Sequence, residues 1–248
     1  MFPPQTWSSF KPGVQIAPGS CTGPGQTSMV ENAIRNARLY ARAGLQVAKS
    51  DNPTDRGIFN DVFNEADRAT VTTALTNAIE ILSKRGQVVV VTCDDLSKRC
   101  GAGSPFMYTV IDESQKFSHR DSLAPIVICV SNVTPFPPLP DPCSQLDGNM
   151  VVAPKQPELS KGVSQASMLL HELMHVDYIS GPSNRRIDDV AYGWYGSHTL
   201  RSKDDWAKVY PRELIQAAPT TNADNFIVLC HFGWIAKAQQ RKCELNNA

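Results

Sequence analysis

Residues 171–175 read His171-Glu172-Leu173-Met174-His175, and this HExxH pentad decides how the rest of the chain is interpreted. On an α-helix, positions i and i+4 lie on one face, so the imidazoles of His171 and His175 can reach one metal ion. Glu172 lies about 100° round the same helix and can contact a water molecule beside that metal. Two neutral nitrogen ligands, a position for water and a neighbouring base are the minimal equipment of zinc-dependent peptide hydrolysis.

The residues around the pentad are apolar on most sides, which predicts a buried helix. They are Met168, Leu169, Leu170, Leu173, Met174 and Val176. Two histidines and a glutamate on a buried helix need partners, and a metal ion supplies them. The alternative, a surface helix with two unrelated histidines, is disfavoured by these flanks.

A catalytic zinc site of this kind needs a third protein ligand, and the sequence after the pentad limits the choice. The three-histidine pattern HExxHxxGxxH is excluded, because Tyr178 and Gly181 stand where it requires Gly and His. The turn-rich segment 180–184 ends the first helix and allows the chain to reverse. A second helix that starts after this turn would bring Asp188 and Asp189 back towards the histidines.

Other acidic residues compete for the same role. Glu213 is the first glutamate after the pentad, and it would serve if the third ligand came from a later helix. Asp177 is less suitable, because it lies about 200° round the same helix from His175. For Asp188 and Asp189 the alternative is an ordinary acidic cap at a helix start. Spacing alone leaves the third ligand open.

The pentad and the later segment Asp188-Asp189-Val190-Ala191-Tyr192-Gly193 together resemble the aspzincins, the deuterolysin-type fungal metalloendopeptidases with HExxH and a downstream GTxxDxxYG motif. Asp189 matches the aspartate ligand of that motif, whereas Arg185 and Arg186 stand where Gly-Thr is usual. Three more segments are similar in order: Gly19-Ser20-Cys21, the Cys93 and Cys100 pair followed by Ile126-Val127-Ile128-Cys129, and Asn222-Ala223-Asp224-Asn225-Phe226. The resemblance covers roughly residues 19 to 243.

The resemblance implies a site with one Zn²⁺ per chain. The implied ligands are His171, His175 and Asp189, with Glu172 as the base that activates water. Tyr192 is implied to stabilise the oxyanion, and its alternative is a core tyrosine with a buried ring.

The resemblance also implies where the substrate is cut. Asp224 matches a position that in this family faces a basic side chain at P1′. Ile227 stands where the strictly lysine-specific relatives carry a second acid. The implied specificity is therefore a preference for Lys or Arg at P1′, with cleavage elsewhere as well. The alternative for Asp224 is a cap on the C-terminal helix.

A competing hypothesis is a proteolytically inactive, secreted zinc-binding effector or surface protein on the same fold. The missing Gly-Thr before Asp189 and the long 135–160 segment favour it. Glu172 and Tyr192 oppose it, because a pure binding site needs neither.

Seven cysteines without CxxC spacing predict disulfides and an extracellular setting. The bridges implied by the resemblance are Cys21–Cys93 and Cys100–Cys129. Cys230 lies in an apolar run and is predicted to be a buried free thiol, which makes Cys243 the better partner for Cys143. Residues 1–5 lack the charged and apolar regions of a secretory signal, so secretion is inferred from the cysteines and the resemblance.

The composition excludes several classes of function. The formal net charge is zero, so a nucleic-acid or anionic-membrane partner has no support. No apolar run approaches the 18 residues of a membrane span. With 248 residues and 42% hydrophobic content, the chain predicts one domain with a substantial core. The expected partners are protein or peptide substrates, and the expected state is a monomer.

The predicted fold is α+β and zincin-like, with helices packed on a small mixed sheet. Residues 1–19 are predicted to be a flexible Pro-rich tail, 20–248 the single domain, and 135–160 a surface loop. Helices are predicted over 28–48, 66–85, the pentad, and from about residues 188 and 222 onward. Strands are predicted over 87–93, 107–112 and 124–131.

Overall fold

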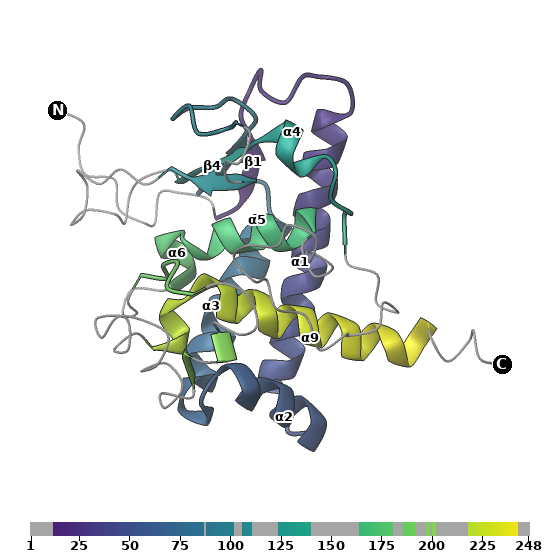
Figure 1. The fold of residues 1–248 in the computed structure, drawn as a ribbon, viewed down its shortest axis with the longest axis vertical. Helices are drawn as coiled ribbons and strands as arrows, with labels where there is room; N and C mark the ends of the chain where they lie inside the picture. The colour runs from purple at the N-terminus through teal and green to yellow at the C-terminus, as the bar shows by residue number, and fades with distance from the viewer. Residues whose placement is uncertain are drawn as a thin grey trace.

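The computed structural model describes residues 12–86, 88–101, 106–110, 124–139, 164–180, 186–191, 197–198, 200–201 and 218–242. In this part of the chain the fold is α+β, as predicted, with long helices and a four-stranded mixed sheet (Figure 1). None of the described helices is long and apolar enough to cross a membrane.

The sheet has the strand order β1-β2-β4-β3. Its strands are β1 (Val14–Ile16), β2 (Val89–Thr92), β3 (Met107–Thr109) and β4 (Ala124–Ile128). The β1–β2 and β2–β4 pairs are parallel, and β3 lies antiparallel to β4 at one edge. The three predicted strands are confirmed, although each is shorter than its β-branched run.

β1 was not predicted, because Val14–Ile16 falls within the segment expected to be a loose tail. Val14 donates a backbone hydrogen bond to Lys84, and Gly13 accepts one from Val89. A Cβ atom at Gly13 would collide with the backbone of residues 84–86, so only glycine fits there. The tail prediction is therefore wrong for these residues. The sequence did not reveal the strand, because three residues are too few to show an alternation of apolar and polar side chains.

Long helices form the rest of the core. The helices are α1 (Gln26–Lys49), α2 (Pro53–Val62), α3 (Arg68–Ser83), α4 (Val130–Val133), α5 (Gln165–Met174), α6 (Asp177–Ser180) and α9 (Ala223–Lys242), with 3₁₀ turns η2 (Glu65–Asp67) and η7 (Pro219–Thr221). The predicted helices at 28–48 and 66–85 correspond to α1 and α3. α2 was not predicted; the Asn52 side chain caps it by accepting a hydrogen bond from Thr54 N at 2.9 Å.

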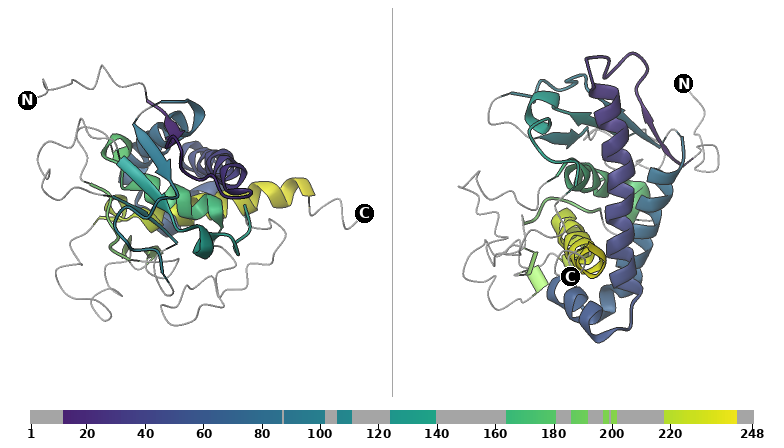
Figure 2. Two further views of the ribbon diagram at one scale, coloured as in Figure 1. Left: turned by 90° about the horizontal axis from the view of Figure 1, so that it is seen from above. Right: turned by 90° about the vertical axis from the view of Figure 1, so that its right-hand side faces the viewer.

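α1 spans the described molecule, with the sheet beside its first half and α9 and α2 beside its second half (Figure 2). α1 and α9 cross closely at two glycines. A Cβ atom at Gly44 would lie 2.5 Å from Cys230 Sγ, and one at Gly233 would lie 2.7 Å from Ala43 O. α5 packs on α1, α9 and β3, so the pentad helix lies between the sheet and α9.

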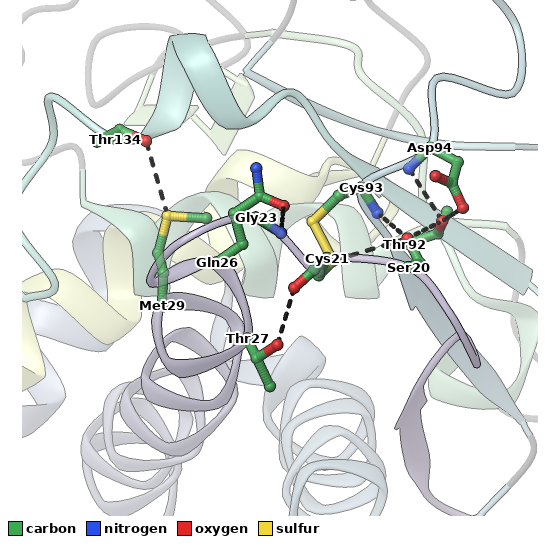
Figure 3. The surroundings of a disulfide bond; sticks show 10 residues. All are labelled: Ser20, Cys21, Gly23, Gln26, Thr27, Met29, Thr92, Cys93, Asp94 and Thr134. Atoms are coloured by element: carbon green, nitrogen blue, oxygen red, sulfur yellow. Dashed lines mark hydrogen bonds between the residues drawn. A yellow bond between two sulfur atoms is a disulfide. The ribbon is translucent and has the colours of Figure 1, made fainter.

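Two disulfides lie at the ends of strands β2 and β4. Cys21–Cys93 joins the segment after β1 to the end of β2, and Cys100–Cys129 joins a loop to the end of β4. Around the first bridge, the Ser20 hydroxyl accepts a hydrogen bond from Cys93 N and contacts Thr92 Oγ1 at 2.9 Å (Figure 3). Both bridges match the pairs that the resemblance implied. Cys230 is a buried free cysteine, as predicted, and Cys143 and Cys243 lie outside the described residues.

Candidate metal centre

The pentad helix begins at a capping box. Ser167 N donates to Ser164 Oγ at 3.1 Å, and Ser164 N donates to Ser167 Oγ at 2.8 Å, so two backbone donors at the helix start are satisfied. Leu169, Leu170 and Leu173 are fully buried. The predicted buried helix is confirmed. It ends at Met174, and His175 occupies its C-cap with helical backbone angles.

His171 and His175 face one another at the end of α5, with ring centroids 5.1 Å apart. Their side chains are only 15% and 7% exposed. The Nδ1 atom of His171 lies 2.7 Å from Asp224 Oδ1, and that of His175 lies 2.9 Å from Ile187 O. Because both acceptors lack protons to donate, each Nδ1 carries the proton and each Nε2 faces the opposite side of the ring.

Asp189 completes the group. Its Oδ1 atom lies 2.8 Å from His171 Nε2 and 3.3 Å from His175 Nε2. Asp188 points elsewhere, since its side chain is 56% exposed and its Oδ1 lies 3.0 Å from Arg186 Nε. Among the described candidates for a third ligand, only Asp189 contacts both histidines. Glu213 lies outside the described residues.

The helix predicted from about residue 188 is wrong for residues 188–191, which are non-helical. Asp188 N donates to Thr221 O at 2.8 Å, and Ala223 N donates to Asp188 O at 3.0 Å. The Asn222 side chain accepts hydrogen bonds from Val190 N and Ala191 N at 2.9 and 3.0 Å. The backbone groups that a helix would use are thus bonded to the segment before α9. Consequently neither Asp188 nor Asp189 caps a helix.

The protonation behaviour of this group follows from these contacts. Burial lowers the pKa of His171, but hydrogen bonds to Asp189 and Asp224 outweigh burial and hold that pKa well above its ordinary value. Burial also lowers the pKa of His175, and Asp189 again raises it overall. Burial raises the pKa of Asp189, whereas the two histidines hold it far below its usual range. A bound cation would take the place of the protons that these groups share.

The spacing of the donor atoms suits a small tetrahedral cation. Zinc bonds of about 2.0–2.1 Å to nitrogen and oxygen place neighbouring ligand atoms about 3.3 Å apart. The two separations from Asp189 Oδ1 are 2.8 and 3.3 Å, so a modest outward movement would fit the ion. His171, Glu172 and His175, whose ligand atoms lie within 4.8 Å of one another, could also hold a metal ion. Asp189 contacts both Nε2 atoms.

The half-buried Glu172 contacts the edge strand of the sheet. The Thr109 Oγ1 atom lies 2.9 Å from Glu172 Oε2 and 2.9 Å from the Glu172 carbonyl oxygen. Sequence reasoning did not identify Thr109. The strand run that contains it was predicted, but no spacing in the chain links residue 109 to residue 172.

The segment that resembles NADN, residues 222–225, contacts the site through Asp224. Asp224, in the first turn of α9, has a side chain only 16% exposed and its Oδ1 bonded to His171. Asn222 donates to Asn225 Oδ1 at 2.8 Å, and Asn225 donates to Val62 O at 2.7 Å. The sequence predicted a substrate-facing Asp224 but missed the bonding of Asn222 and Asn225. Tyr192 lies outside the described residues.

No protein-family model matches the chain, and no curated protein matches it significantly. The resemblance to the aspzincins therefore rests on the quoted motifs, and the family of this chain is a prediction.

Proposed function

We propose that this protein is a secreted, aspzincin-like zinc metalloendopeptidase. One observation carries the proposal: Asp189 Oδ1 contacts the Nε2 atoms of both pentad histidines, 2.8 and 3.3 Å away. The Nδ1 atoms of these histidines are held by Asp224 and by the Ile187 carbonyl. Outer hydrogen bonds of this kind fix the tautomer and orientation of metal-binding histidines.

In this proposal His171, His175 and Asp189 hold one Zn²⁺. When bound, zinc supplies Lewis acidity, which polarises a carbonyl group and makes water nucleophilic near neutral pH. Glu172 accepts the proton of the attacking water and returns it to the leaving amine, because its carboxylate lies beside the ligand cluster. A binding site without catalysis would have no use for a base in this position.

The remaining roles in the proposal come from the resemblance. Tyr192 donates to the oxyanion, and Asp224 favours Lys or Arg at P1′. The Asp224–His171 contact gives Asp224 a further role in orienting a ligand. A carboxylate has about four acceptor sites, so one role does not exclude the other. The substrates in this proposal are proteins or peptides, acted on by a monomer.

The proposal that the protein is secreted is based on its disulfides. Two disulfides with Cα–Cα distances of 5.0 and 5.2 Å are compatible with an extracellular protein. Such bridges persist where the surroundings are oxidising.

The test compares wild type with Glu172→Gln. We expect about one zinc per chain, casein cleavage that a chelator abolishes, and full recovery when Zn²⁺ is returned. Glu172→Gln keeps the zinc and lowers kcat by about a hundred- to ten-thousandfold, because only the base is lost. Zinc binding without cleavage in the wild type would instead favour an inactive zinc-binding effector. Cleavage without metal would refute the metalloenzyme.

A further inference from the structure

Thr109 is the last residue of β3, and its side chain reaches across to the end of α5. It is 8% exposed, so its hydroxyl is largely removed from water and its bonding partners come from the protein. Both partners belong to Glu172: the backbone carbonyl and Oε2, each at 2.9 Å.

The carbonyl contact stabilises the end of the helix. Glu172 O belongs to the last turn of α5, where carbonyl groups lack the usual partner four residues onward. It accepts a hydrogen bond from His175 N at 3.2 Å in the tighter 3₁₀ pattern, and the Thr109 hydroxyl lies on the same oxygen. Thr109 therefore holds the backbone at the position from which the Glu172 side chain departs.

The carboxylate contact fixes the direction of that side chain. Among the described residues, no other side chain forms a hydrogen bond with the Glu172 carboxylate. A glutamate has three rotatable side-chain bonds, and a base that samples many rotamers spends little time beside the attacking water. A threonine hydroxyl has one proton, which the two Glu172 oxygens share, and its place between them restricts the carboxylate together with the backbone.

Thr109 can act in this way because its strand is held by its neighbour β4 and by a side-chain bond to Asp95. Thr109 is in register with Ile126 of β4, and Val110 N donates to Pro125 O at 2.8 Å. One residue earlier, the Tyr108 hydroxyl donates a hydrogen bond to Asp95 Oδ1 at 2.6 Å. The position of the hydroxyl is thus set by the sheet and not by α5 itself.

We propose that Thr109 is a positioning residue that holds the Glu172 carboxylate at the reacting water. This inference rests on the proposed function. It assigns to β3 a share in catalysis that neither the pentad nor the resemblance indicates.

The experiment measures kcat, KM and zinc content of Thr109→Val and Thr109→Ser. Thr109→Val keeps the shape and removes the hydroxyl, so kcat falls by about ten- to a hundredfold, the value of one hydrogen bond to a charged group. KM and zinc content stay within about twofold of wild type, because neither the ligands nor the substrate contacts change. Thr109→Ser restores most of kcat, because serine supplies the same donor.

A matched control and a second background separate positioning from folding. Thr92→Val makes the same change at a buried threonine on β2. The Thr92 hydroxyl contacts Ser20 and has no hydrogen bond to Glu172, so this variant leaves kcat unchanged. In a Glu172→Gln background, Thr109→Val has less than about a threefold further effect on residual activity, since the charged acceptor is gone. A kcat for Thr109→Val within twofold of wild type overturns the proposal, and so does a loss of zinc.

Thermal unfolding of wild type, Thr109→Val, Glu172→Gln and the double variant distinguishes failure of the Thr109 proposal from failure of the proposed function. Non-additive shifts in melting temperature support the contact itself, and additive shifts refute it. An inactive wild type with zinc bound would refute the peptidase and with it any catalytic role for Thr109. An active wild type with additive shifts would refute Thr109 alone.

Discussion

Asp224 and His171 join α9 to α5 through a 2.7 Å hydrogen bond from Nδ1 to Oδ1. The bond connects two segments that are 53 residues apart in the chain. It leaves His171 Nε2 directed at Asp189, so the orientation of one proposed ligand depends on a residue that need not touch the metal.

Asp224→Ala should lower zinc affinity by about ten- to a hundredfold, because His171 loses the acceptor that orients its ring. Asp224→Asn keeps an acceptor oxygen and should lose less. Isothermal titration of metal-free protein with Zn²⁺ measures both effects. Cleavage-site mapping on denatured proteins tests the substrate role separately: a P1′ profile that stays the same in Asp224→Asn would restrict Asp224 to orienting His171.

Asp189→Ala should abolish tight zinc binding, because it removes the oxygen that contacts both histidines. Asp188→Ala is the matched control on the neighbouring residue. It breaks an exposed ion pair with Arg186, so it should cost less than about 1 kcal/mol of unfolding free energy and leave zinc binding intact. Equal loss of zinc in the two variants would place the third ligand elsewhere, and Glu213→Ala would then be measured.

The buried pair of Tyr40 and His231 predicts a loss of stability in acid. The Tyr40 hydroxyl and His231 Nδ1 lie 2.7 Å apart between α1 and α9, and His231 is 4% exposed. Burial lowers the pKa of His231 to about 4 from an ordinary value of 6.5. The unfolded chain therefore takes up the proton first as the pH falls, and stability contributed by neutral His231 is lost between about pH 6.5 and pH 4. This loss amounts to about 3 kcal/mol.

Denaturant unfolding at pH 7, 5.5 and 4, at equal metal content, measures this dependence. His231→Gln keeps an acceptor for Tyr40 but cannot titrate, so its unfolding free energy should fall less steeply over the same range. Parallel curves for wild type and His231→Gln would show that His231 is not the group responsible.

Cys230 should resist alkylation in the native protein and react once the protein is unfolded. Its side chain is fully buried against Gly44, and burial raises the pKa of its thiol far above the ordinary value. Mass mapping under non-reducing conditions should find Cys21–Cys93, Cys100–Cys129 and a third bridge between Cys143 and Cys243. A cross-linked Cys230 would contradict both expectations.

The sequence by itself determined the local features of this site. His175 follows His171 by four positions, and helix geometry turns that spacing into two imidazoles on one face whatever surrounds them. The long amphipathic periods predicted α1 and α3, and the β-branched runs predicted three of the strands. These patterns arise from neighbours in the chain, so they can be recognised without the fold.

Only the tertiary structure decided what lies opposite the pentad. Asp188 and Asp189 are both acids near a turn, and which one faces the histidines depends on the pairing of Asp188 with Asn222 beside α9. The contact between Thr109 and Glu172 joins residues 63 positions apart on a strand and a helix. Such contacts are set by packing between distant segments, where no spacing in the chain records them. The sequence supplied the helix face that carries both histidines, and the fold decided which residues lie opposite that face.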